Sequence, residues 1–177
     1  MIFAIVSDTH GNVANFKKVV GWLNTQNIKL ILHCGDIGIP ESLKESLEDF
    51  CGELIGVFGN MDKNYGILID EYNKISKVKV FEDTAETEID RSPSSHKASD
   101  GLRKIAINHF PEKARGMAQS GKFDLVFYGH THRPWDEKIG ECHMINPGEL
   151  AGQFYKPTFA IYDTITEKLE LKILEKL

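Results

Sequence analysis

The sequence predicts an α/β fold in which two packed mixed β-sheets are flanked by helices. Short apolar runs alternate with amphipathic segments early in the chain, the pattern of βαβ units and a largely parallel sheet. The later part is richer in segments of alternating polarity, which indicates a second, partly antiparallel sheet. The length of 177 residues, 41% of them hydrophobic, fits a single domain over residues 1–177 with a sizeable core.

Apolar runs with little polar alternation predict the buried strands. These runs are Ile2–Val6, Ile28–Leu32, Leu54–Phe58, Ile105–Ile107 and Leu125–Phe127. Strands of this composition are typically covered on both faces, as in a sheet with helices or a second sheet packed against it.

Three amphipathic segments predict helices between these strands. The first is Asn12–Thr25, where Asn12 is suited to cap the helix N-terminus. The second is Pro40–Phe50, with Pro40 in its first turn, and the third is Glu112–Ser120, which ends before a glycine.

Further strands and one long loop complete the predicted fold. The strands are Lys77–Phe81, Glu86–Ile89, Glu137–Ile145, Thr158–Asp163 and Leu169–Leu174. The polar, serine-rich stretch at residues 91–101 is predicted to be a loop between two strands.

Composition restricts the partners and the location. The chain has 21 Lys and Arg against 26 Asp and Glu, a net charge of −5, which argues against a protein that coats long nucleic acid or an acidic membrane. A small phosphorylated substrate is compatible with this charge. Three cysteines without C-x-x-C spacing favour a reducing compartment, and MIFAIVSDTH lacks the basic region of a signal peptide. We therefore expect a cytoplasmic protein.

Candidate metal ligands follow five of the predicted strands at their carboxyl ends. They are Asp8 and His10, Asp36, Asn60 with Asp62, His109, and His130 with His132. Taken alone, each motif could be explained without a metal, since Asp and Asn are common in the turns that follow strands. Ligands bind at the carboxyl ends of the strands in open α/β sheets, so the side chains converge if the five strands share a sheet and a direction. Glycines before three of the motifs would let the backbone turn sharply and approach the bound group closely.

The motifs together resemble the calcineurin-like metallophosphoesterase family. They read D-x-H, G-D, G-N-x-D, a lone His and G-H-x-H, and extend from Asp8 to His132. The first helix and Asn146-Pro147-Gly148 resemble the small bacterial and archaeal phosphodiesterases of that family. The resemblance implies an αββα sandwich and a phosphoesterase that depends on two metal ions.

The resemblance also implies a role for each ligand. Asp36 bridges the two metals, and the remaining ligands divide into Asp8, His10 and His132 for one metal and Asn60, His109 and His130 for the other. Catalysis is assigned to Asp36, Asn60 and His10, with in-line attack on phosphorus by a hydroxide that bridges the metals. Imidazole and carboxylate ligands without thiolate suit Mn²⁺, Ni²⁺, Fe, Co²⁺ or Zn²⁺, and we expect Mn²⁺ first.

Two positions depart from the family pattern, and a third is open to two interpretations. Met61 stands where many members have a His, and methionine cannot donate a proton, so activated diesters should be preferred. Phe110 follows His109 where the family usually has Gly, and its ring could narrow the mouth of the site. Asp62 either orients a ligand His or stabilises a turn.

The remaining basic side chains receive structural interpretations. His33 is predicted to be a buried, hydrogen-bonded core residue, His143 to cover a sheet face and His96 to be solvated in the polar loop. Arg133 could reach a substrate phosphate, although a surface ion pair is the default.

The predicted function is a metal-dependent phosphodiesterase acting on a small phosphodiester, with no long nucleic acid and no membrane as partner. A protein-binding scaffold of the same fold is one alternative, but scaffolds usually lack a ligand and all seven are present here. A phosphomonoesterase or nuclease is another, which Met61 and the acidic charge disfavour. Whether the protein is a homo-oligomer stays open, as does the physiological substrate.

Overall fold

The first sheet of the computed structural model has the strand order β11-β10-β1-β2-β3-β4. The structure describes all residues except 65, 67 and 91–100. The strands of this sheet are β1 (Ile2–Val6), β2 (Leu30–His33), β3 (Glu53–Val57), β4 (Val78–Phe81), β10 (Thr158–Asp163) and β11 (Lys168–Ile173). β1 to β4 run parallel, whereas β10 is antiparallel to both of its neighbours.

The second sheet has the order β5-β6-β7-β9-β8. Its strands are β5 (Thr84–Asp90), β6 (Leu102–Asn108), β7 (Leu125–Phe127), β8 (Trp135–Ile139) and β9 (Cys142–Asn146). The three central strands are parallel and the two edge strands antiparallel. Both sheets are therefore mixed, as the sequence predicts.

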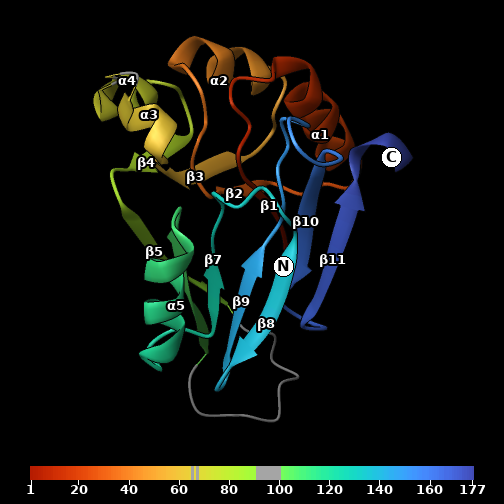
Figure 1. The fold of residues 1–177 in the computed structure, drawn as a ribbon. Helices are drawn as coiled ribbons and strands as arrows, with labels where there is room; N and C mark the ends of the chain where they lie inside the picture. Colours follow the sequence, from red (N-terminus) through yellow and green to blue (C-terminus); the bar gives the residue numbers. More distant parts are fainter. Residues whose placement is uncertain (65, 67, 91–100) are drawn as a thin grey trace.

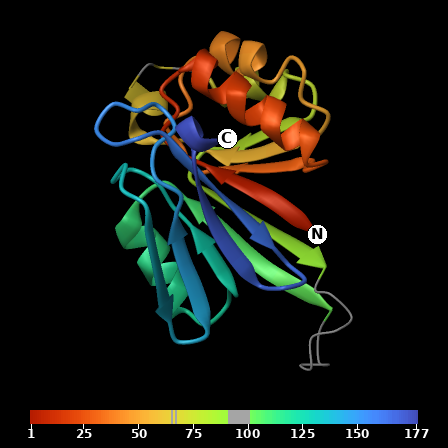
Figure 2. The same cartoon turned by 90° about the vertical axis from the view of Figure 1, so that its right-hand side faces the viewer.

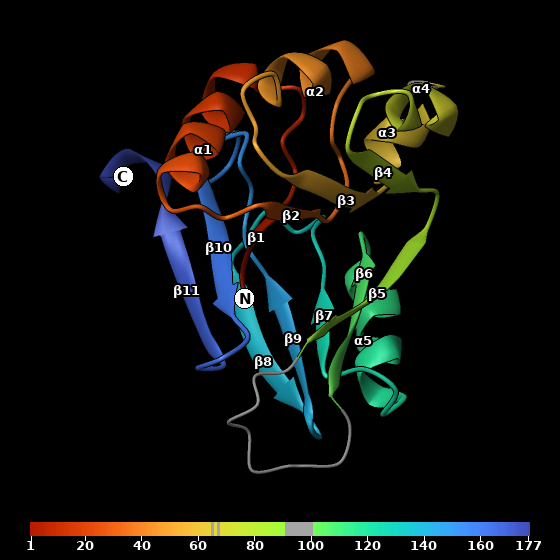
Figure 3. The same ribbon diagram turned by 180° about the vertical axis from the view of Figure 1, so that it is seen from behind.

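Helices cover the outer faces of the two stacked sheets (Figures 1 and 2). The helices are α1 (Val13–Thr25), α2 (Pro40–Ser46), α3 (Asn60–Asn64), α4 (Ile69–Asn73), α5 (Pro111–Gln119) and a final 3₁₀ turn (Leu174–Lys176). α1 and α2 lie outside the first sheet and α5 outside the second, and Figure 3 shows α3 and α4 beside β4. This arrangement is the αββα sandwich.

Three apolar clusters fill the three interfaces between these layers. β1 shows why its sequence is apolar throughout. Phe3 and Ile5 point into the cluster between the sheets, where Phe3 packs edge-on against Phe127, whereas Ala4 and Val6 point toward the helices. Successive side chains of a strand face opposite sides, so a strand buried on both faces has no polar position.

The predicted helices are present with small changes. The Asn12 side chain caps α1 and accepts the backbone N–H of Asn15 at 3.0 Å. α2 ends at Ser46, four residues before its predicted end, and the chain continues in turns that still bring Leu47 and Phe50 onto the same cluster. α3 and α4 were not predicted.

Two predictions about the second half need correction or lie outside the described residues. Glu137–Ile145, predicted as one strand, belongs to the hairpin β8–β9, because the chain reverses at Gly140, which has φ +60°. Except for Gly101, the predicted loop at 91–101 lies outside the described residues. No helix in the described part of the chain is both long and apolar enough to cross a membrane.

Candidate metal centre

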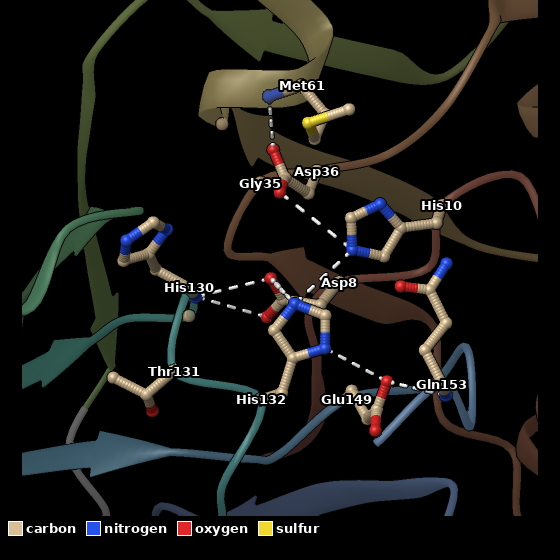
Figure 4. A network of polar contacts seen from close by, with 12 residues as sticks. Asp8, His10, Gly35, Asp36, Met61, His130, Thr131, His132, Glu149 and Gln153 are labelled. Atoms are coloured by element: carbon tan, nitrogen blue, oxygen red, sulfur yellow. Dashed lines mark hydrogen bonds and ion pairs between the residues drawn. The ribbon is translucent and has the colours of Figure 1, made fainter. Parts of the chain in front are cut away.

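The seven candidate ligands meet where strand ends from both sheets come together. Figure 4 shows Asp8, His10, Asp36, His130 and His132 of this set. Asp8 and His10 follow β1, Asp36 follows β2, Asn60 opens α3 after β3, His109 follows β6, and His130 and His132 follow β7. The five strands do not share one sheet, so that condition of the sequence argument is wrong. The side chains converge nevertheless, because the two sheets pack face to face with these ends adjacent.

Five of the seven residues have left-handed backbone conformations. The φ angles are 49° at Asp8, 44° at His10, 53° at Asp36, 68° at His130 and 60° at His132. A left-handed conformation costs a non-glycine residue about 1–2 kcal/mol. Only three other non-glycine residues in the described part of the chain adopt it. Strained backbone conformations of this kind are found most often at functional sites. There they direct side chains to positions that a regular strand would not reach.

The first group of ligands consists of Asp8, His10 and His132. His132 Nε2 lies 3.5 Å from Asp8 Oδ1 and 3.4 Å from His10 Nε2. The two imidazoles stack with ring centroids 5.1 Å apart. The three side chains can direct one ligand atom each to a common point, since these atoms all lie within 4.8 Å of one another.

The second group is arranged around Asn60. Its Oδ1 lies 3.1 Å from His109 Nε2 and 3.0 Å from His130 Nδ1. Asp36 lies between the two groups, because its Oδ2 is 3.6 Å from His109 Nε2 and 3.8 Å from His10 Nε2. Asp8 can also serve both groups, since it shares a second set of ligand atoms with Asp36 and His109.

Two of the imidazoles are held in the tautomer that a metal requires. His109 Nδ1 lies 2.8 Å from the carbonyl oxygen of Cys34, and His132 Nδ1 lies 2.9 Å from Glu149 Oε2. An oxygen acceptor at Nδ1 keeps the hydrogen there, so Nε2 of each ring presents its lone pair to the centre. His109 Nε2 and Asn60 Oδ1 are then two acceptors in contact, which a bound cation would satisfy. The residues fit a divalent metal.

Burial disfavours the charges of the metal-free centre. It raises the pKa of Asp8 to about 7 and also raises the pKa of Asp36. Burial lowers the pKa of His10, and it lowers the pKa of His109 to about 4. Neutral imidazoles are ready to coordinate, and a divalent cation would favour ionised carboxylates over protonated ones.

Two glycines allow the ligand loops to approach each other. A Cβ atom at Gly59 would lie 2.0 Å from Asp36 Oδ1, and one at Gly129 would lie 2.0 Å from Ser7 Oγ and 2.8 Å from Asp8 Oδ2. The sequence predicted that these glycines bring the backbone close to a bound group. The structure shows that they bring it close to the ligand carboxylates and their neighbours instead.

Asp62 stabilises turns, and its carboxylate has no hydrogen bond to a histidine among the described residues. Its buried carboxylate accepts backbone N–H groups of Ile37 at 2.9 Å, Gly38 at 3.1 Å and Gly59 at 2.8 Å. These amides belong to the segments that follow Asp36 and precede Asn60. Of the two interpretations from the sequence, the structure supports the second, and Asp62 joins two ligand loops.

Glu149 supports the centre and was not predicted from the sequence. Its carboxylate is fully buried and binds both His132 and the loop after β9, where it accepts the backbone N–H groups of Gln153, Phe154 and Tyr155. The available signal was its position directly after Asn146-Pro147-Gly148, together with the need of a ligand imidazole for an acceptor on its second nitrogen.

Asn146 holds the loop that carries His130 and His132. Its Nδ2 donates to the carbonyl oxygen of Gly129 and to Thr131 Oγ1, each at 3.0 Å. The N-P-G turn therefore supports the centre as well as reversing the chain.

Phe110 and Met61, the two residues that depart from the family pattern, lie beside the candidate ligands. The Phe110 ring packs against His109 and His130, with centroids 5.1 and 5.2 Å away. Met61 donates its backbone N–H to Asp36 Oδ1 at 2.8 Å.

The histidines outside the ligand set have structural roles where they are described. The prediction for His33 is confirmed, since it is buried and hydrogen-bonded, and His143 contacts Asp136 near the surface. His96 lies outside the described residues.

Comparisons with known proteins agree with this geometry. The model of the calcineurin-like phosphoesterase superfamily domain matches residues 1–167. Phosphodiesterase MJ0936 of Methanocaldococcus jannaschii is 30% identical over 176 residues, which cover 99% of this chain and 100% of that protein.

Solved structures share the fold. An archaeal phosphodiesterase aligns with a TM-score of 0.82 and 29% identity, covering 98% of this chain and 99% of the other. A Vps29 from Entamoeba histolytica aligns with a TM-score of 0.66 and 19% identity, covering 97% of this chain and 90% of the other. The second likeness concerns the fold alone.

Proposed function

The chain belongs to the calcineurin-like phosphoesterase superfamily, and from that premise we propose that it is a phosphodiesterase that hydrolyses small phosphodiesters at a dinuclear metal site. One observation carries the proposal. Asp36 Oδ2 lies 3.8 Å from His10 Nε2 and 3.6 Å from His109 Nε2, between two groups of nitrogen and oxygen ligands. A shared carboxylate between two such groups is what two neighbouring cations need, because their charges repel each other.

The metals, when bound, would lower the pKa of a water molecule and neutralise charge on the phosphoryl oxygens. The residues of the chain hold and orient the ions. Asp8, His10 and His132 form one half of the site and Asn60, His109 and His130 the other, with Asp36 between them. This mixture of imidazole, carboxylate and amide ligands favours Mn²⁺, with Ni²⁺, Fe, Co²⁺ and Zn²⁺ as the alternatives.

The substrate class follows from what the centre lacks. Met61 offers its backbone N–H to Asp36 and has no side-chain proton for a leaving group. Diesters with good leaving groups, such as aryl oxides, are therefore the proposed substrates, in preference to monoesters. The net charge of −5 favours a small diester over a long nucleic acid. We place the reaction in the cytoplasm, where the three unpaired cysteines would stay reduced.

A protein-binding scaffold would not need this centre. Binding of a protein partner requires neither two imidazoles fixed with Nε2 facing inward nor strained ligand loops held by buried Asp62 and Glu149. The complete ligand set therefore favours the enzyme over the scaffold, and Met61 favours a diesterase over a monoesterase.

The test uses protein stripped of metal and recharged separately with Mn²⁺, Ni²⁺, Zn²⁺ or Mg²⁺. We expect hydrolysis of bis(p-nitrophenyl) phosphate, strongest with Mn²⁺, and slower hydrolysis of p-nitrophenyl phosphate. Asp36→Asn should reduce the rate to that of the stripped protein. Asp49→Asn, the same change at an exposed position outside the candidate metal centre, should retain the wild-type rate. Hydrolysis of neither ester with any metal, or full activity of Asp36→Asn, would overturn the proposal.

A further inference from the structure

A cavity of about 410 Å³ opens beside the loop that carries His130 and His132. Thr131 and Arg133, which alternate with these histidines along the chain, line it. Figure 4 shows Thr131 between the two ligands on this loop. We call this hollow, bounded also by Trp135 and Tyr155, the side cavity. The loop that carries His130 and His132 therefore contributes residues to both the metal centre and the side cavity.

Two of the walls of the side cavity are exposed aromatic rings. Trp135 is 48% exposed and Tyr155 is 50% exposed, so each ring has a free surface. Phe154, the neighbour of Tyr155, packs edge-on against the His132 ring with centroids 4.9 Å apart. The loop that lines the cavity with Tyr155 therefore also contacts the candidate ligand His132. Exposed rings of this kind bind nucleobases by stacking, with little dependence on sequence.

The side cavity also holds one cation without an acidic partner. Arg115 forms an ion pair with Glu137, with 2.5 Å between the guanidinium nitrogen and Oε1. The same Oε1 accepts a hydrogen bond from Trp135 Nε1–H at 3.3 Å. Arg133 makes no ion pair with any described residue, and its guanidinium lies over the Trp135 ring, 5.7 Å from the centroid. The surface ion pair expected by default for Arg133 is therefore not what the structure has. A planar cation on an exposed ring suits an aromatic ligand with acceptor atoms or negative charge.

The backbone of Tyr155, one of the two aromatic walls, is held in place before any ligand arrives. The backbone N–H groups of Phe154 and Tyr155 donate to the buried carboxylate of Glu149, Phe154 at 2.6 Å. A wall fixed in this way loses little conformational entropy when a ligand binds.

We propose that the side cavity binds the non-leaving arm of the substrate, and that this arm is a nucleoside whose base stacks on Trp135 and Tyr155 while Arg133 contacts its polar atoms. This inference rests on the proposed function, because the phosphodiester of the same molecule must lie at the metal centre. The substrate class is then a small nucleotide diester.

Two diesters with the same leaving group separate this inference from the general activity. Thymidine 5′-(p-nitrophenyl phosphate) and methyl p-nitrophenyl phosphate both release p-nitrophenol, so the ratio of their kcat/KM values reports on the retained arm. We expect a ratio of at least about 10 in favour of the thymidine ester, within the range of base stacking on an aromatic side chain. Trp135→Ala and Arg133→Met should each reduce the ratio several-fold, mainly through KM. Lys138→Met removes a cation from the same strand outside the cavity and should leave the ratio unchanged.

A second readout needs no metal and no turnover. Stacking of thymidine 5′-monophosphate on Trp135 should quench tryptophan fluorescence, and the chain has only two tryptophans. The quench should persist in Trp22→Phe and disappear in Trp135→Phe.

Each outcome decides one proposal. A ratio near 1, or a ratio unchanged in Trp135→Ala and Arg133→Met, would refute the nucleoside subsite while the phosphodiesterase stands. If neither ester is hydrolysed with any metal, the proposed function fails, and the fluorescence titration still decides whether the side cavity binds a nucleotide.

Discussion

His132 Nδ1 and Glu149 Oε2 form a hydrogen bond of 2.9 Å, and the same carboxylate accepts three consecutive backbone N–H groups of the loop after β9. Burial alone would raise the pKa of Glu149, but these hydrogen bonds outweigh it and hold the pKa below its ordinary value. The ionised carboxylate thus holds both a candidate metal ligand and the backbone that carries Tyr155 of the side cavity.

Glu149→Gln should weaken Mn²⁺ binding by about 10- to 100-fold, the usual effect of removing the hydrogen-bond partner of a ligand histidine. Glutamine has one acceptor oxygen for four donors, and its amide can donate to Nδ1 and so favour the wrong tautomer. Isothermal titration of metal-stripped protein with Mn²⁺ measures the affinity. Glu53→Gln, at the exposed first residue of β3, is the matched control and should bind Mn²⁺ like wild type. Equal affinities for all three proteins would mean that Glu149 does not prepare His132 for metal.

Gly59→Ala should destabilise the protein by about 1–3 kcal/mol, as overpacking does in a site that cannot relax. The added Cβ would lie 2.0 Å from Asp36 Oδ1 and 2.4 Å from its backbone nitrogen, so the carboxylate has to move and Mn²⁺ affinity should fall as well. Urea unfolding and Mn²⁺ titration test the two effects.

The matched control for this change is Gly116→Ala in α5, where a Cβ meets nothing within 4 Å. Alanine favours the helix by about 0.5–1 kcal/mol over glycine, so this variant should be slightly more stable than wild type. A Gly59→Ala protein as stable as Gly116→Ala, with unchanged Mn²⁺ affinity, would contradict the argument.

The ligand positions were predictable because each follows an apolar strand, and local sequence carries that information. Sheet membership was not, because the pairing of β6 with β5 and β7, instead of with a strand of the first sheet, depends on contacts distant in the chain. The hairpin at Gly140 was missed for a related reason, since polar and apolar residues alternate on both sides of the turn and only the glycine marks it.

Residues that support the ligands were harder to foresee than the ligands themselves. From the sequence, Asp62 could either orient a ligand histidine or stabilise a turn, and its hydrogen bonds to three backbone amides show that it stabilises turns. Glu149 lies 17 positions from the histidine it holds, so no local pattern links the two. Carboxylates buried by tertiary structure resemble surface carboxylates in sequence.

His33 should make the stability of the metal-free protein depend on pH. The buried ring accepts the Gly35 N–H at Nδ1 and donates from Nε2 to Thr9 Oγ1, at 3.2 and 2.9 Å, so it has no room for a second proton. Burial lowers the pKa of His33 from its ordinary value of 6.5 to about 3. Below pH 6.5 the unfolded chain takes up a proton at this position while the folded chain does not. The free energy of unfolding therefore falls toward acid pH, by up to about 1.4 kcal/mol per pH unit from this residue.

His33→Gln removes this contribution, because glutamine does not titrate. The variant should be less stable than wild type at pH 7.5, since the hydrogen bonds of the ring are imperfectly replaced. The difference should then narrow as the pH falls from 6.5 toward 4.5, because only the wild type loses stability through this position. Urea unfolding at pH 7.5, 5.5 and 4.5 in the presence of a chelator measures the difference. A constant difference across this range would show that His33 has the same proton affinity in the folded and unfolded chains.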